Sequence, residues 1–227
     1  MVKLYKGMRI LFFKEIYERY SQLDFTYPTD RAVGIRGIET RLAKLFGNAQ
    51  YGIIQDPREY SYLPRTLLWQ RADREIPMEK IGYPESRTVP SWSWMAVSGA
   101  VHYVDIPFAA VDWNTNVEAH FDDFANPTSI SACNQPLPTI RGIANNFVQE
   151  PQDDVIFDCA LDASSFGNLG CLILGTDSEL VEGRQRHYAL IIVPTEHDDL
   201  YQRIGVGILT RDDGWMESMP GQDIRLV

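Results

Sequence analysis

Tyrosine, arginine and glycine occupy alternate positions in residues 201–209, and the apolar residues Ile204, Val206 and Ile208 alternate with them. In an extended strand Tyr201, Arg203 and Gly205 share one face, and the glycine leaves room where a side chain would otherwise stand. An arginine that faces open space can donate hydrogen bonds to a carbonyl group of a bound molecule. The segment therefore predicts one wall of a small-molecule pocket.

Two further strand-like segments carry mixed faces of the same kind. Arg141 and Phe147 share a face of one, while His102 and Tyr103 lie on opposite faces of the other. If these faces converge inside a barrel, they form an aromatic cavity with a few directed donors, which is the usual form of a small-molecule site. The alternative is that Arg141 and Arg203 pair with acidic residues on the outer surface.

Residues 90–94 read Pro-Ser-Trp-Ser-Trp. Proline restricts its own φ and the backbone of the residue before it, so we expect a strand to begin here. Trp92 and Trp94 would then point to the same face. Two interpretations are open: the pair closes one end of a core, or it forms the wall of a ligand cavity.

Motifs for other kinds of chemistry are missing. The sequence has no nucleophile elbow, no phosphate-binding glycine loop and no dinucleotide fingerprint. Its histidines are scattered, so we expect no metal site and no cofactor. Cofactor-free cyclisation or isomerisation of an apolar substrate needs none of these, because holding a reactive conformer and polarising a carbonyl can assist it. The catalytic candidates are Arg203, His102 and Tyr103, and the substrate-binding candidates are Trp92, Trp94, Arg141, Phe147, Tyr201 and Gly205.

Composition narrows the classes of partner. The chain has 227 residues, is 44% hydrophobic and 23% charged, and carries a net charge of −10. Such a protein is globular and would repel nucleic acids and anionic membrane surfaces. Charged residues interrupt the N-terminal apolar segment, so neither a signal peptide nor a membrane span is expected there. The three cysteines lack the spacing of a zinc or redox motif, and buried thiols in the cytoplasm are expected: Cys133, Cys159 and Cys171.

The pattern changes near residue 88. Before it, apolar residues recur at helical spacing in two segments, and Gly47 can end the second. The apolar positions of the first segment are Met8, Leu11, Phe12, Ile16 and Tyr20. Asp56 followed by proline and glutamate predicts the start of a third helix. We expect a helical region over residues 1–88 and a β-rich region over 89–227, packed together as one compact unit.

After residue 88 the sequence consists of short β runs separated by turn residues. The expected strands are 97–104, 108–113, 138–148, 154–161, 169–175, 187–193, 201–209 and 222–227. About eight strands of this size predict an α+β fold, in which N-terminal helices pack on an antiparallel β-barrel or β-sandwich. Both faces of 187–193 are apolar, so both should be covered, one of them by helices. The acidic insertion at 114–137 is either a lid or a surface excursion.

Several segments resemble one protein family. Leu67-Leu68-Trp69 and the later Pro90-Ser91-Trp92-Ser93-Trp94-Met95-Ala96 resemble the paired tryptophan signature of fungal heterokaryon-incompatibility (HET) proteins. Residues 29–38 are similar to a helix of that family, 201–207 are similar to one of its strands, and Trp215 and residues 224–227 follow in the same order. The resemblance covers the C-terminal region of these proteins, without the amino-terminal HET signalling domain.

The sequence leaves two functions open, besides a relic without activity. The first is a stand-alone HET-like module that encloses an apolar small molecule, as a cofactor-free cyclase or isomerase, pericyclic or Diels–Alder-type, of fungal specialised metabolism. The alternative is a non-enzymatic recognition or regulatory module with a protein partner, which the resemblance implies because incompatibility proteins act in self/non-self discrimination. An exposed apolar face on the helices of residues 1–70 would favour the alternative.

Overall fold

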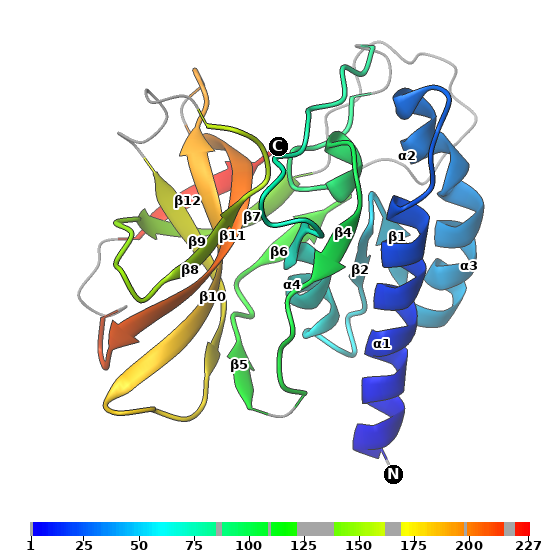
Figure 1. Cartoon of the computed structure of the whole chain (residues 1–227). Coiled ribbons are helices and arrows are strands. Elements are labelled where there is room, and N and C mark those ends of the chain that lie inside the picture. The colour runs from blue at the N-terminus through cyan, green and yellow to red at the C-terminus, as the bar shows by residue number, and fades with distance from the viewer. Residues whose placement is uncertain are drawn as a thin grey trace.

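The computed structural model describes residues 2–84, 88–108, 110–121, 139–161, 169–197, 199–215 and 221–227. Within these ranges the chain has an α+β fold, as the sequence predicts. Figure 1 shows α1, α2 and α3 on one side of the molecule and a strongly curved sheet on the other, with α4 and β4 between them.

The helices lie in the first half of the chain. The α-helices are α1 (Val2–Ser21), α2 (Arg31–Gly34), α3 (Arg36–Phe46) and α4 (Tyr62–Leu67), and the short 3-10 turns are η1 (Pro28–Asp30) and η3 (Trp94–Ala96). Gly47 ends α3 as predicted: its φ is 95° and its N–H donates to the Ala43 carbonyl at 3.0 Å. None of the helices in the described residues combines the length and apolarity needed to cross a membrane.

The predicted start of a third helix at Asp56 is wrong. The Asp56 carboxylate accepts a hydrogen bond from the Arg58 N–H at 2.9 Å and so closes a turn. The helix begins only at Tyr62. The acid, proline and glutamate pattern was read as a helix cap, but it stabilises a tight turn that precedes the helix.

Helix α1 is where predicted, but its buried face is not the predicted one. Ile10, Phe13 and Tyr17 are fully buried, whereas the predicted core positions Met8 and Phe12 are exposed. Helical spacing could not select the buried face because α1 carries apolar residues on all sides.

Eight strands form one sheet in the order β5-β9-β10-β11-β12-β7-β6, and β8 pairs with β11. Their bounds are β5 (Val111–Trp113), β6 (Glu118–His120), β7 (Thr139–Asn146), β8 (Asp154–Phe157), β9 (Gly170–Asp177), β10 (Arg184–Pro194), β11 (Leu200–Asp212) and β12 (Gln222–Leu226). A further pairing of β9 with β7 closes a ring of β7, β9, β10, β11 and β12. All pairs are antiparallel except β11 with β12, so the predicted barrel is confirmed.

Small strand pairs lie outside this sheet. They are β1 (Asn48–Gln50) with β2 (Ile53–Gln55), and β3 (Trp69–Arg71) with β4 (Val101–Tyr103). The predicted strand at 97–104 therefore belongs to the β3–β4 pair and not to the barrel. Within the predicted lid, β6 pairs with β7 as part of the sheet, and residues 122–138 lie outside the described residues.

Buried apolar side chains form three clusters. The barrel cluster takes residues from every strand of the ring and from α4, and includes Tyr188, Leu190 and Ile192. The helical cluster joins α1, α3, β3, η3 and β4. The outer cluster lies on the other face of the strands and includes Ala189 and Ile191. Both faces of β10 are thus buried, as predicted, and the barrel cluster on one of them includes Leu63 and Leu67 of α4.

The two tryptophans of residues 90–94 do not lie in a strand. The Ser93 side chain accepts a hydrogen bond from the Met95 N–H at 3.1 Å, which starts the η3 turn. Trp92 therefore enters the barrel cluster and Trp94 the helical cluster, and both are fully buried. The prediction that they share one face is wrong, and each belongs to a different core.

The cysteines of the described residues are free thiols. Cys171 is buried, as predicted, and burial raises the pKa of its thiol to about 12. Cys159 is only partly buried, and Cys133 lies outside the described residues.

Candidate functional site

Arg203 on β11 is buried, and its side chain is fully enclosed. Its guanidinium forms a two-point ion pair with Asp158, with Nε–Oδ2 at 2.9 Å and Nη2–Oδ1 at 3.1 Å. Nη1 donates to the Leu67 carbonyl and Nη2 to the Trp69 carbonyl, each at 2.5 Å. The guanidinium carbon lies 3.4 Å from the centroid of the Trp69 ring. We call this arrangement of Arg203, Asp158, Leu67 and Trp69 the Arg203 junction.

The Arg203 junction binds its own chain and leaves no face open to a ligand. Burial raises the pKa of the Asp158 carboxyl, and the Arg203 guanidinium opposes that rise. The acidic partner that the alternative interpretation expected is present, but the pair is buried and not on the outer surface. Each charge offsets the cost of burying the other, so removing either partner would leave an uncompensated buried charge.

The segments that carry the family resemblance meet at this junction. The Trp69 indole N–H donates to the Trp92 carbonyl at 2.9 Å. The Ser91 hydroxyl accepts from the Arg203 N–H at 3.0 Å. On the other side, the Arg31 guanidinium carbon lies 4.8 Å from the centroid of the Trp94 ring. These side chains connect the helical layer to the barrel, which is a structural role.

The other two proposed catalytic residues lie next to each other on β4 but face different environments. Tyr103 is buried, and burial raises the pKa of its phenol well above the ordinary value, so the phenol keeps its proton at neutral pH. His102 is half-exposed, with Nδ1 3.6 Å from a carboxylate oxygen of Glu18. Arg203 lies in the junction, so the three candidates do not share one accessible space.

The remaining binding candidates are dispersed. Arg141 is exposed on β7, Phe147 packs in the outer cluster, and Tyr201 is half-buried at the start of β11. Gly205 leaves no room for a ligand, because a Cβ atom there would stand 2.5 Å from the Ile156 carbonyl oxygen of β8. The prediction that Arg203 and Gly205 share one open face of β11 is wrong. Ile192 pairs with Arg203 and Ile191 with Gly205, so a β-bulge at Ile204 puts the two residues on opposite faces. The backbone of β8, which pairs with β11 edge to edge, closes the space at Gly205. None of the predicted site residues lines the cavity described next.

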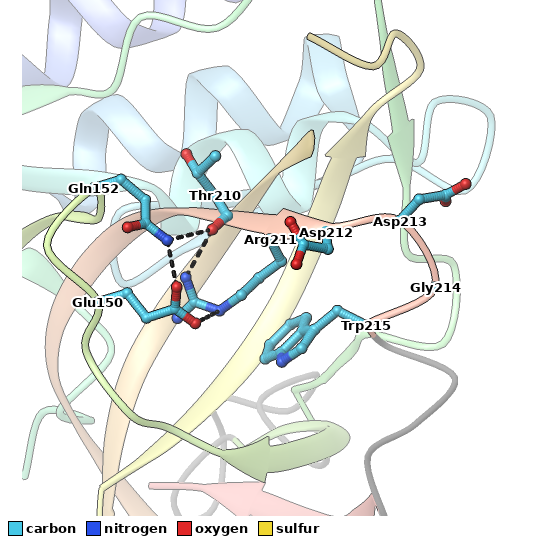
Figure 2. Close-up of a pocket in the computed structure, with 8 residues that line it drawn as sticks. All are labelled: Glu150, Gln152, Thr210, Arg211, Asp212, Asp213, Gly214 and Trp215. Atoms are coloured by element: carbon cyan, nitrogen blue, oxygen red, sulfur yellow. Dashed lines mark hydrogen bonds and ion pairs between the residues drawn. The ribbon is translucent and has the colours of Figure 1, made fainter. Parts of the chain in front are cut away.

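A cavity of about 330 Å³ lies at the end of β11, lined by other residues. They are Glu150, Gln152, Thr210, Arg211, Asp212, Asp213, Gly214 and Trp215. Figure 2 shows Arg211 between Glu150 and Trp215, with Gln152 bridging Glu150 and the Thr210 carbonyl. Its lining comes from the end of β11 and from nearby turns, whose sequences carry no recognisable motif, so no sequence pattern indicated this cavity.

The arginine of this cavity is already paired. Arg211 is buried and donates to both carboxylate oxygens of Asp153, with Nη1–Oδ1 at 2.5 Å and Nη2–Oδ2 at 2.8 Å. Its Nε lies 3.5 Å from a carboxylate oxygen of Glu150, and its guanidinium carbon lies 5.1 Å from the centroid of the Trp215 ring. These contacts fix the loop before β8 to the end of β11 and leave the cavity without a free cation.

The outer side of α1 carries a different kind of surface. Tyr5, Met8, Leu11 and Phe12 expose between 47% and 62% of their surface, within three helical turns. We call these four residues the α1 face. In Figure 1, α1 lies on the helical side of the molecule, and its N-terminal turns extend beyond the end of α3. The sequence signal for the α1 face was the number of large apolar residues in α1, which exceeds the number that one buried stripe needs.

Glu39 on α3 is a buried acid of the helical layer. Its Oε1 accepts a hydrogen bond from the Gly52 N–H at 2.8 Å. Burial raises the pKa of its carboxyl from 4.5 to about 7, while the Gly52 N–H and the Arg36 guanidinium oppose the rise. The folded protein therefore binds a proton at Glu39 that the unfolded chain releases between these values.

His187 on β10 shows the opposite shift. Its Nδ1 lies 2.9 Å from the Thr176 hydroxyl. Burial lowers the pKa of the imidazole from 6.5 to about 4, the Arg211 charge adds to the lowering, and the Asp177 carboxylate opposes it. Here the unfolded chain binds the additional proton.

The two groups should have opposite effects on stability. The contribution of Glu39 to the free energy of unfolding is fully present below pH 4.5 and is lost as pH rises through 7. The neutral imidazole of His187 lowers the free energy of unfolding at low pH, and this loss disappears as pH rises from 4 to 6.5. Relative to the parent, we expect Glu39→Gln to make the free energy of unfolding rise with pH in the shared window, and His187→Gln to make it fall, each by on the order of 1 kcal/mol per pH unit. Urea unfolding between pH 4.5 and 6.5 measures both slopes. Equal slopes in the two variants would contradict the assignment.

Comparison of the chain with protein-family models, curated proteins and solved structures finds no match. The functional argument therefore depends on the geometry of the described residues.

Proposed function

We propose that this chain is a non-enzymatic recognition module that binds a protein partner through the α1 face. The observation that carries the proposal is the exposure of four large apolar side chains on one side of a helix whose other side is buried in the helical cluster. A helix with one buried stripe ordinarily carries polar residues on its opposite side, but four large apolar residues stand there in α1. Apolar patches of this kind on soluble proteins mark interaction sites.

The resemblance to HET proteins supports the same class of function, because those proteins act in self/non-self discrimination. The segments that carry the resemblance lie in the packed region between helices and barrel, where they hold the two layers together. In this proposal the resembling residues supply the framework, and α1 supplies the contact surface.

Cofactor-free cyclisation has less support. Its proposed donors Arg203 and Tyr103 are buried in packed surroundings, and Trp92 and Trp94 belong to two separate clusters. An enzyme of that kind needs its donors to converge on one substrate-sized space. Cofactor-free cyclisation therefore stays a prediction. Binding of an apolar ligand to the purified protein would support it.

Photo-crosslinking tests the recognition function. Benzoylphenylalanine in place of Met8, introduced in the cells that naturally make the protein, is expected to give a discrete light-dependent adduct, because Met8 lies in the middle of the α1 face. The matched control is the same replacement at Tyr27, an exposed aromatic residue outside the α1 face. Mass spectrometry identifies the crosslinked protein. No adduct, or the same adducts from both positions, would contradict the proposal.

A further inference from the structure

Three basic side chains near the α1 face are already bound to the chain. Lys6 forms an ion pair with Glu59 at 2.8 Å. Arg9 lies over the ring of Tyr5, with its guanidinium carbon 4.8 Å from the centroid, and donates to the Leu45 carbonyl at 3.3 Å. Lys14 donates to the carbonyl of Val104 at 3.0 Å. An acidic peptide or an anionic lipid surface would have to break these contacts, so the face suits an apolar partner.

The apolar surface continues on both sides of α1. Leu45, at the end of α3, is 51% exposed, and Arg9 connects it to α1. Phe108 is 47% exposed on the other side, and its ring would stand 3.7 Å from a Cβ atom on Gly7. With the α1 face this makes six large, roughly half-exposed apolar side chains.

The area of this surface matches what a symmetric dimer needs. Half-exposed side chains of this size offer on the order of 100 Å² each, so two copies would bury about 1,200 Å² in total. That value reaches the lower end of specific, stable protein interfaces. A surface that is neutral and apolar is also complementary to itself, whereas one with free charges of a single sign is not.

The spacing of the α1 face permits a two-fold arrangement. Tyr5, Met8 and Phe12 follow one another at intervals of three and four residues, the spacing of a helix–helix seam. In an antiparallel pair with its axis near Met8, Tyr5 of each helix lies opposite Phe12 of the other. One turn further along the same stripe, Glu15 pairs with Arg19 at 2.6 Å, which marks the polar end of the seam.

We propose that the α1 face is covered by a second copy of this chain, in an antiparallel two-fold dimer. The proposal rests on the recognition function and names its partner. Leu45 and Phe108 would lie at the borders of the α1–α1 contact, where they shield the seam from water.

Analytical ultracentrifugation of the purified full chain tests the dimer. We expect a species of twice the 25.9 kDa chain mass at micromolar concentrations, with dissociation on dilution. Met8→Glu should weaken the dimer at least tenfold, because it would bury two unpaired carboxylates at the axis. Tyr27→Glu, at an exposed site elsewhere, should leave the dimer unchanged. Unaltered far-UV circular dichroism and unfolding midpoints show that each variant is folded.

Two results would overturn the dimer: a monomer at all concentrations, or a Met8→Glu variant that dimerises like the parent. Crosslinking at position 8 distinguishes this failure from failure of the recognition function. A monomer whose position 8 crosslinks to a different protein overturns the dimer and retains the recognition function. A monomer that gives no adduct overturns both.

Discussion

Replacing Arg203 with methionine is expected to lower the free energy of unfolding by about 3–5 kcal/mol, because the buried Asp158 carboxylate would lose its partner. The Leu67 and Trp69 carbonyls would also lose their donors, in a place that water does not reach. Chemical unfolding of the purified variant measures the loss. Since the junction connects β11 to α4 and β3, we expect the helical layer and the barrel to unfold together in the parent.

Arg225 supplies the matched control. It forms the same two-point pair with Asp199, with both nitrogen–oxygen distances at 3.0 Å, but at the exposed end of β12. Arg225→Met should therefore change stability far less, because water replaces the partner. Adding Asp158→Leu to Arg203→Met should restore part of the loss, since it removes the unpaired charge. Equal effects of Arg203→Met and Arg225→Met would show that burial of the pair is not what matters.

Trp94→Ala is expected to cost about 3–5 kcal/mol of stability, because it leaves a large cavity in the helical cluster. The indole packs against Tyr17 and Tyr20, with ring centroids at 5.8 and 6.1 Å, and against the Arg31 guanidinium. Gly52 passes so close beneath the ring that any side chain there would collide with the Trp94 nitrogen. A drop in the urea midpoint with an unchanged denaturant slope would register the effect.

Trp113→Ala is the control for this prediction. Trp113 lies on β5 at the margin of the barrel cluster and is only partly buried, so water can fill the space that its removal leaves. We expect a smaller loss of stability than for Trp94→Ala. A Trp94→Ala variant as stable as the parent would instead favour the interpretation of this residue as a ligand-cavity wall.

Strand periodicity predicted most of the barrel strands, because both alternating sets of residues 187–193 are apolar and the structure buries both. It could not predict what covers each set. The alternation in residues 201–209 predicts one open face for Arg203 and Gly205, but the β-bulge at Ile204 puts them on opposite faces. Asp158 pairs with Arg203, and the backbone of the neighbouring strand β8 closes the space at Gly205. A pairing between distant segments decides whether such a face is pocket or core, and no local pattern encodes that pairing.

Local signals also competed with one another in the helical half. The serine between the two tryptophans caps a 3-10 turn, which overrides the extended preference that proline sets upstream. In α1 there are more apolar residues than one buried stripe needs. Helical spacing alone therefore predicted a core face that includes residues on the exposed side of the helix. The same excess is what now defines the candidate binding surface.

The route of the chain through its two main clusters also sets an order of assembly during synthesis. The buried members of the helical cluster lie between Ile10 and Tyr103, whereas the barrel cluster requires Ile224 and Leu226 of β12. Domains form from the N-terminus as the chain leaves the ribosome. The helical cluster can therefore form early, whereas the apolar side of α4 stays uncovered until β12, the last strand of the ring, is synthesised. During that interval the nascent chain exposes apolar surface that the folded protein buries.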